Sequence, residues 1–340
     1  MKTWLIAGVI IAIIVVSSGA GLYLYSVNLP PEAQTKTIID STGASVEVPI
    51  NVDRVVALRS GIIEMMIVLG AEDKLVGVDE QTVVGTGYGE FNARLCPQLM
   101  DLTAPVSGKT VNVEQVIALD PDVILIGGYG RLSWIDPLKA ANLTVVVTHF
   151  EEIGNFTRDL NILAQVIGKE NEANAVTPHV QGVLDKVESR VGDLPTAEQV
   201  TAYFCSHDIY HVYGSTTFEH AQIVQANGVN VAESITTWLP EVSPEQLLLW
   251  NPEIIFTLEG TSLEDILSDT RIQDVSAIKN GKVYSIAECG WDFGSLRALF
   301  SIEWMASKLY PDKFSDLDMT QEANSFYQAV YGVDYTGPSL

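Results

Sequence analysis

A fifteen-residue pattern occurs twice in this chain, and the two copies lie 131 residues apart. Residues 112–126 read NVEQVIALDPDVILI and residues 243–257 read SPEQLLLWNPEIIFT, and they align without a gap. Each copy starts with a residue that favours a helix N-cap, continues with Glu and Gln, and meets a proline after a short apolar run. A short apolar segment follows, so we expect a helix and then a buried strand, once in each half of the chain.

The segments around the repeat predict two α/β lobes. Short apolar runs alternate with helical stretches, and we expect strands at 55–58, 75–78, 123–126, 145–147, 200–204, 254–257 and 283–286. Near-continuous apolar strands separated by helices are typical of a parallel sheet that helices cover on both faces. A length of 340 residues also exceeds what one compact core usually holds. The predicted fold is therefore two lobes, each with a central, mostly parallel sheet flanked by helices.

A long helical stretch joins the predicted lobes. Apolar residues recur at helical spacing over residues 155–190, and Pro178 is expected to kink or divide the stretch. We predict one long connecting helix or two abutting helices. The expected boundaries are a membrane anchor or signal segment at 1–28, an N-terminal lobe at 29–152, the connecting helix at 153–192 and a C-terminal lobe at 193–340.

The N-terminal segment predicts a transmembrane anchor. The 22 residues from Trp4 to Tyr25 carry no charge, and as a helix they would be about 33 Å long, enough to cross a bilayer core. Lys2 precedes them, which favours a cytoplasmic N-terminus. A cleaved signal peptide is the alternative, because the small residues 17–20 offer a cleavage site. Either interpretation places the lobes outside the cytoplasm.

Charge and motif content exclude several function classes. The net charge of −24 makes nucleic acid a poor partner, because a phosphate backbone requires a basic face. The sequence has neither a Gly-x-Ser-x-Gly nor a His-Glu-x-x-His motif, so we predict no catalytic residues and no cofactor. A metal-dependent enzyme remains a less favoured alternative.

Glu114 and Glu245 occupy equivalent positions in the two repeat copies. Each could simply stabilise the N-terminus of its helix, by up to about 1 kcal/mol. Alternatively, the two could form a matched pair of exposed acids, one on each lobe, that contacts matched basic pockets of a partner. The residues alone leave both interpretations open.

Several further segments occur in a characteristic order. They are DRVVAL at 53–58, YGSTTF at 213–218, ANGVNVA at 226–232, AIKNGKVY at 277–284 and SLRAL at 295–299. Together with the two repeat copies, this ordered set resembles the extracytoplasmic solute-binding proteins of ABC importers for iron–siderophore complexes, haem and cobalamin. The resemblance covers roughly residues 36–315.

The resemblance implies two lobes joined by a long helix, with a ligand in the cleft between them. It also implies a monomer that docks Glu114 and Glu245 into arginine pockets of an ABC permease, which works with an ATPase. Such proteins usually carry a lipidated cysteine or a cleaved signal, so a helical anchor would depart from the family and resemble the arrangement of archaea and some Gram-positive-like envelopes. A ligand sensor that uses the same fold is the alternative function.

Ligands of parallel α/β sheets bind beyond the carboxyl ends of the strands. The candidate ligand-binding residues at these positions are Arg59, Ser60, Gln81, Tyr129, Arg131 and His149 in the first lobe, and His207, Tyr210, Glu259, Trp291 and Phe293 in the second. Trp238 precedes the second repeat copy and could close the cleft. Aromatic and polar groups suit a large chelate, and arginine suits its carboxylates or phosphate. We rank ferric siderophore first, then cobalamin, then haem. Packing between the lobes is the alternative role.

Four further residues raise the possibility of a metal site. Cys205, His207, His211 and Cys289 could bind a bare metal ion, although their spacing matches no standard zinc motif. Cys205 and Cys289 could instead form a disulfide. His207, Tyr210 or His211 could ligate haem iron.

Overall fold

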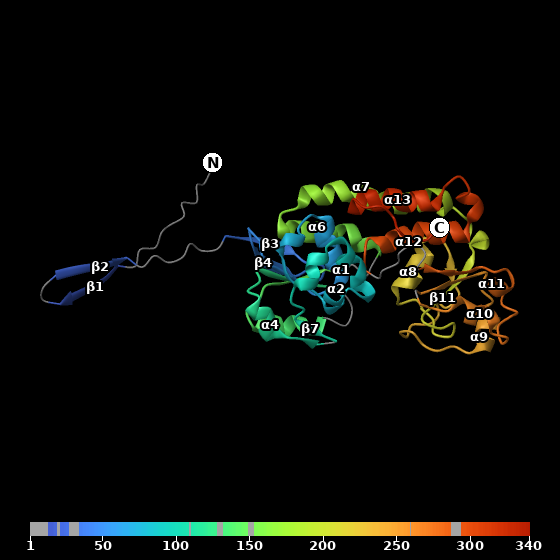
Figure 1. Ribbon diagram of the computed structural model, residues 1–340, viewed down its shortest axis with the longest axis horizontal. Helices are drawn as coiled ribbons and strands as arrows, with labels where there is room; N and C mark the ends of the chain where they lie inside the picture. Colours follow the sequence, from blue (N-terminus) through green and yellow to red (C-terminus); the bar gives the residue numbers. More distant parts are fainter. Residues whose placement is uncertain are drawn as a thin grey trace.

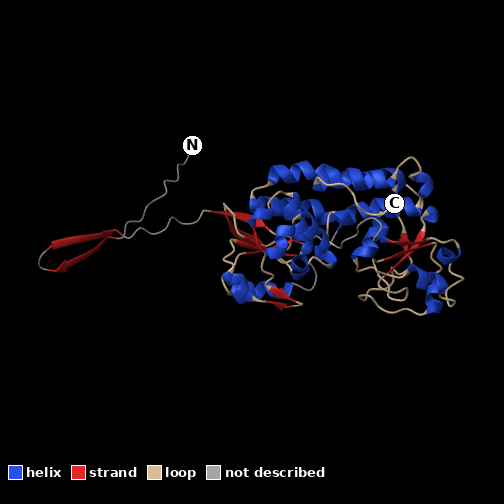
Figure 2. Ribbon diagram, viewed as in Figure 1, coloured by secondary structure: helices blue, strands red, loops and turns tan. Residues whose placement is uncertain are grey.

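The computed structural model describes residues 13–18, 21–26, 34–108, 110–127, 132–148, 153–258, 260–286 and 294–340. Two α/β lobes lie side by side, and long helices run along one side of both (Figures 1 and 2). The predicted architecture of two lobes with helix-flanked parallel sheets is confirmed.

Each lobe contains a sheet of four parallel strands. In the N-terminal lobe the strands are β5 (Val55–Ala57), β6 (Leu75–Gly77), β9 (Val123–Gly127) and β10 (Val145–Thr148), in the spatial order β10-β9-β5-β6. In the C-terminal lobe they are β11 (Thr201–Cys205), β12 (Val229–Asn230), β13 (Ile254–Thr257) and β14 (Val283–Ser285), in the order β12-β11-β13-β14. Counted along the chain, both sheets have the order 2-1-3-4, so the lobes share one topology.

The sequence repeat has the same structure in both lobes. Helix α4 (Val113–Ala118) leads into β9, and helix α9 (Pro244–Trp250) leads into β13. The predicted caps form, because Asn112 Oδ1 accepts a hydrogen bond from the Gln115 N–H at 3.1 Å and Ser243 Oγ accepts one from the Gln246 N–H at 3.2 Å. The repeat therefore marks equivalent positions of two similar lobes.

The remaining helices cover the sheets. In the N-terminal lobe they are α1 (Ser60–Val68), α2 (Glu80–Val84), α3 (Glu90–Leu95) and α5 (Ile135–Ala140), with hairpins β3 (Thr35–Ile39)–β4 (Ser45–Pro49) and β7 (Val106–Ser107)–β8 (Thr110–Val111). In the C-terminal lobe they are α8 (Phe218–Gln225), α10 (Leu263–Ser268), α11 (Ser276–Lys279), α12 (Arg297–Leu309) and α13 (Met319–Tyr331).

Two abutting helices join the lobes, as one of the two alternatives predicted. Helix α6 (Phe156–Ile167) ends at Gly168, whose φ of 74° is left-handed, and α7 (Glu170–Val191) follows. Of the two effects expected of Pro178, a kink or a division, division is wrong, because Pro178 lies inside α7 without ending it. The chain breaks at Gly168 because glycine adopts a positive φ at little steric cost.

Helix α7 belongs to a helical layer that spans both lobes. It packs against α12 and α13, which come from the end of the chain (Figure 1). Lys186 of α7 forms ion pairs with Glu303 of α12, at 2.9 Å, and with Glu322 of α13. One apolar cluster contains buried residues of both sheets and of these helices. The lobes therefore share a core, which restricts their relative motion.

A buried carboxylate also holds the end of the chain to the first lobe. Glu64 of α1, only 1% exposed, accepts hydrogen bonds from the Leu296 N–H at 3.0 Å, Arg297 Nε at 3.2 Å and the Tyr331 hydroxyl at 2.7 Å. The Arg297 guanidinium also lies 3.9 Å from the centre of the Phe91 ring. Arg297 thus has a structural role between the lobes.

The N-terminal segment differs from the predicted helix. Strands β1 (Ile13–Ser18) and β2 (Gly21–Ser26) pair as an antiparallel ribbon. Four consecutive β-branched residues at positions 13–16 favour this extended backbone. Across the part of the chain that the structure describes, no helix has the length and apolar character needed to cross a membrane.

Candidate functional site

The carboxyl ends of the first and third strands of each sheet mark the candidate ligand site. In the order 2-1-3-4 the first strand lies beside the third, so β5 lies beside β9 and β11 lies beside β13. The strand order reverses between these two strands, and an open α/β sheet binds ligands beyond the carboxyl ends of the strands at such a point. The start of α1, just after β5, lies close to the segment that precedes α12 of the C-terminal lobe. A Cβ atom placed on Gly61, just after β5, would lie 1.9 Å from the carbonyl oxygen of Gly294, which follows β14.

Arg59 and Ser60 lie together at the carboxyl end of β5. Arg59 is the half-buried N-cap residue of α1, with φ −152° and ψ 134°, and Ser60 is buried as the first residue of the helix. Asn92 of α3 donates a hydrogen bond from Nδ2 to the Ser60 carbonyl oxygen at 2.8 Å. The predicted residue Gln81 is exposed on the neighbouring α2. A guanidinium next to a helix N-terminus suits an anionic ligand group.

Tyr210 is engaged within its own lobe. Its hydroxyl donates a hydrogen bond to Asp269 Oδ2 at 2.6 Å, and the Arg271 guanidinium lies 4.8 Å from the centre of its ring. Burial and the carboxylate of Asp269 raise the pKa of Tyr210. Arg271, through its hydrogen bonds, holds the pKa of Asp269 well below the ordinary range. Together with exposed His207 these residues line a hollow of about 380 Å³.

Trp238 lies on a loop of the C-terminal lobe that contacts the segment before α8. The residue is 68% exposed, and its ring makes an edge-to-face contact with Tyr213, at 6.1 Å between centroids. The Ser215 N–H donates to the Ile235 carbonyl oxygen at 2.8 Å, which fixes the Trp238 loop beside this segment. A hollow of about 580 Å³ begins there, lined by Ile153, Gly154, Ser215, Thr216, Thr217, Phe218, His220, Ala221, Val224 and Gln225. The hollow therefore lies between the start of the connecting segment and α8.

A buried carboxylate adjoins this hollow and was missed by the sequence analysis. Glu219, in the first turn of α8, is 3% exposed, and burial raises its pKa to about 7. Its Oε2 atom has no hydrogen-bond partner within the part of the chain that the structure describes. Burial lowers the pKa of the neighbouring His220. The only signal for Glu219 in the sequence is its position two residues after Thr217, the N-cap residue of α8.

Six predicted ligand residues lie outside the described residues. Tyr129, Arg131, His149, Glu259, Trp291 and Phe293 follow β9, β10, β13 and β14 in the sequence. Their roles, and those of the residues described above, stay predictions.

The structure gives the metal-site alternative no support among the described residues. Cys205 is a free, fully buried thiol whose pKa is raised by burial, so the disulfide with Cys289 is not formed. His211 Nδ1 lies 2.7 Å from Asp208 Oδ2. Where the chain is described, no three His, Cys, Asp or Glu side chains are grouped to hold a metal ion. Cys289 itself lies outside the described residues.

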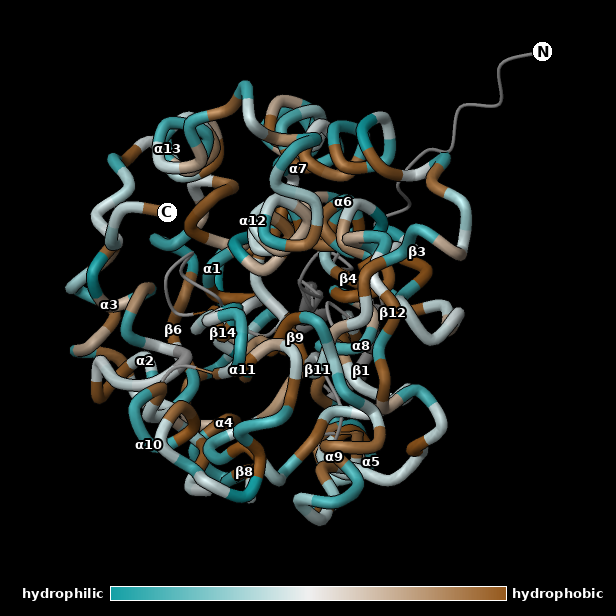
Figure 3. Tube along the Cα trace, turned by 90° about the vertical axis from the view of Figure 1, so that its right-hand side faces the viewer, coloured by the Kyte–Doolittle hydropathy of each residue, from teal (hydrophilic) through white to brown (hydrophobic). Residues whose placement is uncertain are grey.

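The two repeat glutamates lie on one side of the molecule. Glu114 and Glu245 are exposed in the first turns of α4 and α9. In two perpendicular views, α4 and α9 lie on the side opposite α7 and α13 (Figures 1 and 3). Hydrogen bonds from the backbone and from Ser243 lower the pKa of Glu245, which keeps it charged at neutral pH. Both lobes thus present an acidic group on the same face.

A family model described as periplasmic binding protein matches residues 55–288, well over half of the chain. The protein belongs to this family. Among curated relatives, the molybdate-binding protein MolA of Haemophilus influenzae is 25% identical over 327 residues, covering 88% of this chain and 92% of the relative. The vitamin B12-binding protein of Vibrio cholerae is 23% identical over 271 residues, covering 77% and 90%.

A solved structure shows the same fold. The structure of the Haemophilus influenzae protein MolA bound to molybdate has a TM-score of 0.77 at 24% identity, and the alignment covers 89% of this chain and all of that one. The relatives are substrate-binding proteins of ABC transporters rather than enzymes, and they carry transported ligands rather than resident cofactors. The predicted resemblance and the absence of an enzymatic function are therefore confirmed.

Proposed function

We propose that this periplasmic binding protein captures a metal-containing solute between its lobes, outside the cytoplasm, and delivers it to an ABC permease that is driven by an ATPase. The observation that carries the proposal is the presence of an exposed glutamate in the first turn of both repeat helices, on one face of the molecule. A matched acid on each lobe suits a partner with two equivalent basic pockets. The shared core would limit lobe closure to a small movement.

The proposed ligand is a metal chelate, with ferric siderophore ranked before cobalamin and haem. Half-buried Arg59 at the N-terminus of α1 supports an anionic ligand, because guanidinium and helix dipole both favour negative charge. Exposed Trp238, on the loop that contacts Ser215, supports a ligand with a planar or apolar surface. Relatives whose names refer to vitamin B12 and iron uptake are compatible with this class.

A small metal oxyanion is the second candidate ligand. The observation that favours it is the similarity to the molybdate-binding protein MolA, which extends over 92% of that relative. Arg59 and the α1 N-terminus would suit an oxyanion as well as the acidic groups of a chelate. Trp238 distinguishes the two candidates, because an oxyanion needs no large aromatic surface.

A ligand panel tests the proposal. Purified protein is titrated calorimetrically and by thermal denaturation with ferric siderophores, cobalamin, haem, molybdate and tungstate, with sulfate as the control anion. A true ligand at 100 times its dissociation constant stabilises the protein by about 2.7 kcal/mol. Arg59→Gln should weaken binding of either anionic class, whereas Trp238→Ala should weaken only a chelate. If no member of the panel binds, the proposal is wrong.

The attachment of the protein to the membrane is also a proposal. A ribbon with open edges cannot reside in hydrocarbon, so the uncharged run would have to become helical in a bilayer. A single-pass anchor predicts that the protein stays with the membrane fraction after washing with carbonate. Release of a protein shortened at residues 17–20 would instead support the cleaved signal.

A further inference from the structure

Each repeat helix carries an exposed large apolar residue one turn after its glutamate. Ile117 follows Glu114 by three positions and is 51% exposed, and Leu249 follows Glu245 by four positions and is 77% exposed. Residues three or four positions apart lie on the same face of a helix. The outward face of each repeat helix thus presents a carboxylate together with an apolar side chain.

The opposite faces of these helices are used for folding. Val116 of α4 and Leu247 of α9 are fully buried and align at the repeat offset of 131 residues. Each repeat helix therefore already contributes a fully buried apolar side chain to the core of its lobe. Ile117 and Leu249 do not take part in these buried contacts and remain largely exposed, so a partner can reach both side chains.

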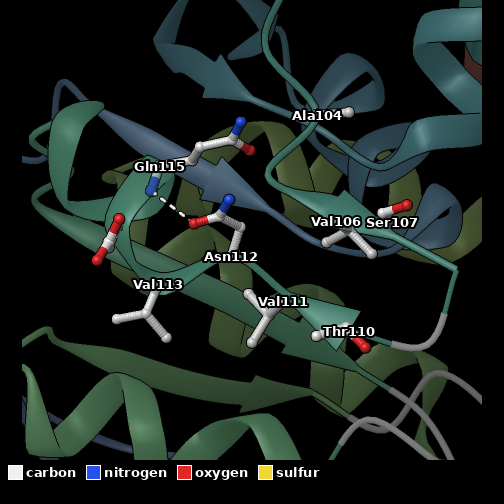
Figure 4. Close-up of a pocket in the computed structure, with 9 residues that line it drawn as sticks. Ala104, Val106, Ser107, Thr110, Val111, Asn112, Val113 and Gln115 are labelled. Atoms are coloured by element: carbon white, nitrogen blue, oxygen red, sulfur yellow. Dashed lines mark hydrogen bonds between the residues drawn. The ribbon is translucent and has the colours of Figure 1, made fainter.

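The N-terminal lobe adds a hollow of mixed apolar and polar lining, and Glu114 is one of its lining residues. It has a volume of about 540 Å³ and lies between α4 and the β7–β8 hairpin, with Val106, Val111 and Val113 among its lining residues. Figure 4 shows Val106 and Val111 on the hairpin strands, Val113 at the start of α4, and the hydrogen bond from Gln115 to Asn112. An apolar side chain of a partner could enter this hollow while its basic group meets Glu114.

We propose that Ile117 and Leu249 are apolar anchors, which together with Glu114 and Glu245 form two docking contacts, one on each lobe; the glutamates are equivalent in the repeat, whereas Ile117 aligns with Leu248 and Leu249 with Ala118. The inference rests on the proposed function, because the partner is the permease. That partner would present, in two symmetric copies, a basic group beside an apolar pocket. An exposed ion pair alone contributes little affinity, whereas a desolvated apolar side chain contributes more. The glutamates thus set orientation and encounter rate, and the anchors set the dissociation rate.

Charge argues against two other occupants of this surface. An anionic bilayer would repel a chain with a net charge of −24. A second copy of the chain would bring like-charged glutamates together in a two-fold contact. A basic partner has neither disadvantage.

The test measures binding of the full-length protein to its permease–ATPase complex in nanodiscs over a range of salt concentrations. The double variant Ile117→Ser with Leu249→Ser should bind at least about tenfold more weakly, with an unchanged salt dependence. Glu114→Gln with Glu245→Gln should weaken binding and reduce its salt dependence. Ile39→Ser with Ile50→Ser removes two exposed apolar residues of the β3–β4 region and should bind like the unmodified protein.

The outcomes separate this inference from the proposed function. If the serine double variant binds normally while the glutamine variant does not, permease docking stands and the apolar anchors are refuted. If neither double variant weakens binding, docking through the repeat helices fails altogether. The inference is also overturned if the unmodified protein is a dimer in solution that Leu249→Ser dissociates, because the anchors would then cover a self-interface.

Discussion

Removal of the Glu64 carboxylate should destabilise the whole protein, because this group joins the first lobe to the end of the chain. Glu64→Ala would leave Arg297, 7% exposed, without its carboxylate partner. It would also remove the acceptor for the Leu296 N–H and the Tyr331 hydroxyl. Removing one partner of a buried ion pair costs about 3–5 kcal/mol, and we expect a value in this range.

A graded series makes this prediction sharper. Tyr331→Phe deletes only the hydrogen bond from the Tyr331 hydroxyl to the Glu64 carboxylate and should cost about 1.5–3 kcal/mol. Asp274→Ala is the matched control, since its pair with Lys279 is exposed, at 83% and 56%, and should contribute about 0–1 kcal/mol. The free energy of unfolding comes from urea denaturation followed by fluorescence and circular dichroism. A cost for Glu64→Ala no larger than that of Asp274→Ala would refute the role assigned to this carboxylate.

Three further predictions concern pH, packing and transport. The pKa of Glu219, raised to about 7, favours the protonated form in the folded state. The contribution of Glu219 to stability is therefore complete below about pH 4.5 and is lost as the pH rises through 7. Glu219→Gln should flatten this part of the profile of stability against pH relative to the unmodified protein. Gly61→Ala should destabilise the lobe junction, since the new Cβ would lie 1.9 Å from a backbone oxygen. Gly182→Ala inside α7 meets no atom within 4 Å and should stabilise the protein by about 0.5–1 kcal/mol. Equal effects of the two variants on the melting temperature would contradict this difference. Glu114→Ala with Glu245→Ala should abolish uptake by cells while calorimetry shows unchanged ligand affinity, and normal uptake would exclude the docking role.

Local patterns in the sequence predicted the repeated unit correctly. The caps at Asn112 and Ser243 and the prolines that follow each helix act within a few residues, so they specify α4–β9 and α9–β13 without tertiary information. In the connecting stretch, Gly168 and Pro178 are both local signals for an interruption of the helix, and the helix ends at Gly168. Pro178 was expected to kink or divide the connecting stretch, but α7 continues through it. A proline within a packed helix loses one backbone hydrogen bond, which the contacts of α7 with α12 and α13 can offset.

Contacts between distant residues could not be predicted from one sequence. Glu64 and Arg297 are separated by 233 positions, and neither lies in a local pattern that points to the other. The same applies to α13, whose Tyr327 and Tyr331 pack edge-on against Phe91 of the first lobe. The candidate site was predictable only as strand ends, since topology places Arg59 and Ser60 there but does not decide what their side chains contact.

The metal content of the protein purified from its native host tests the central claim most directly. Mass spectrometry of the released ligand, with elemental analysis and a visible absorption spectrum, identifies the occupant without assuming its class. We expect close to one metal-containing solute per chain, and a smaller amount when Arg59 is changed to Gln. Protein that carries no such solute, and that no chelate or metal oxyanion stabilises thermally, would contradict it.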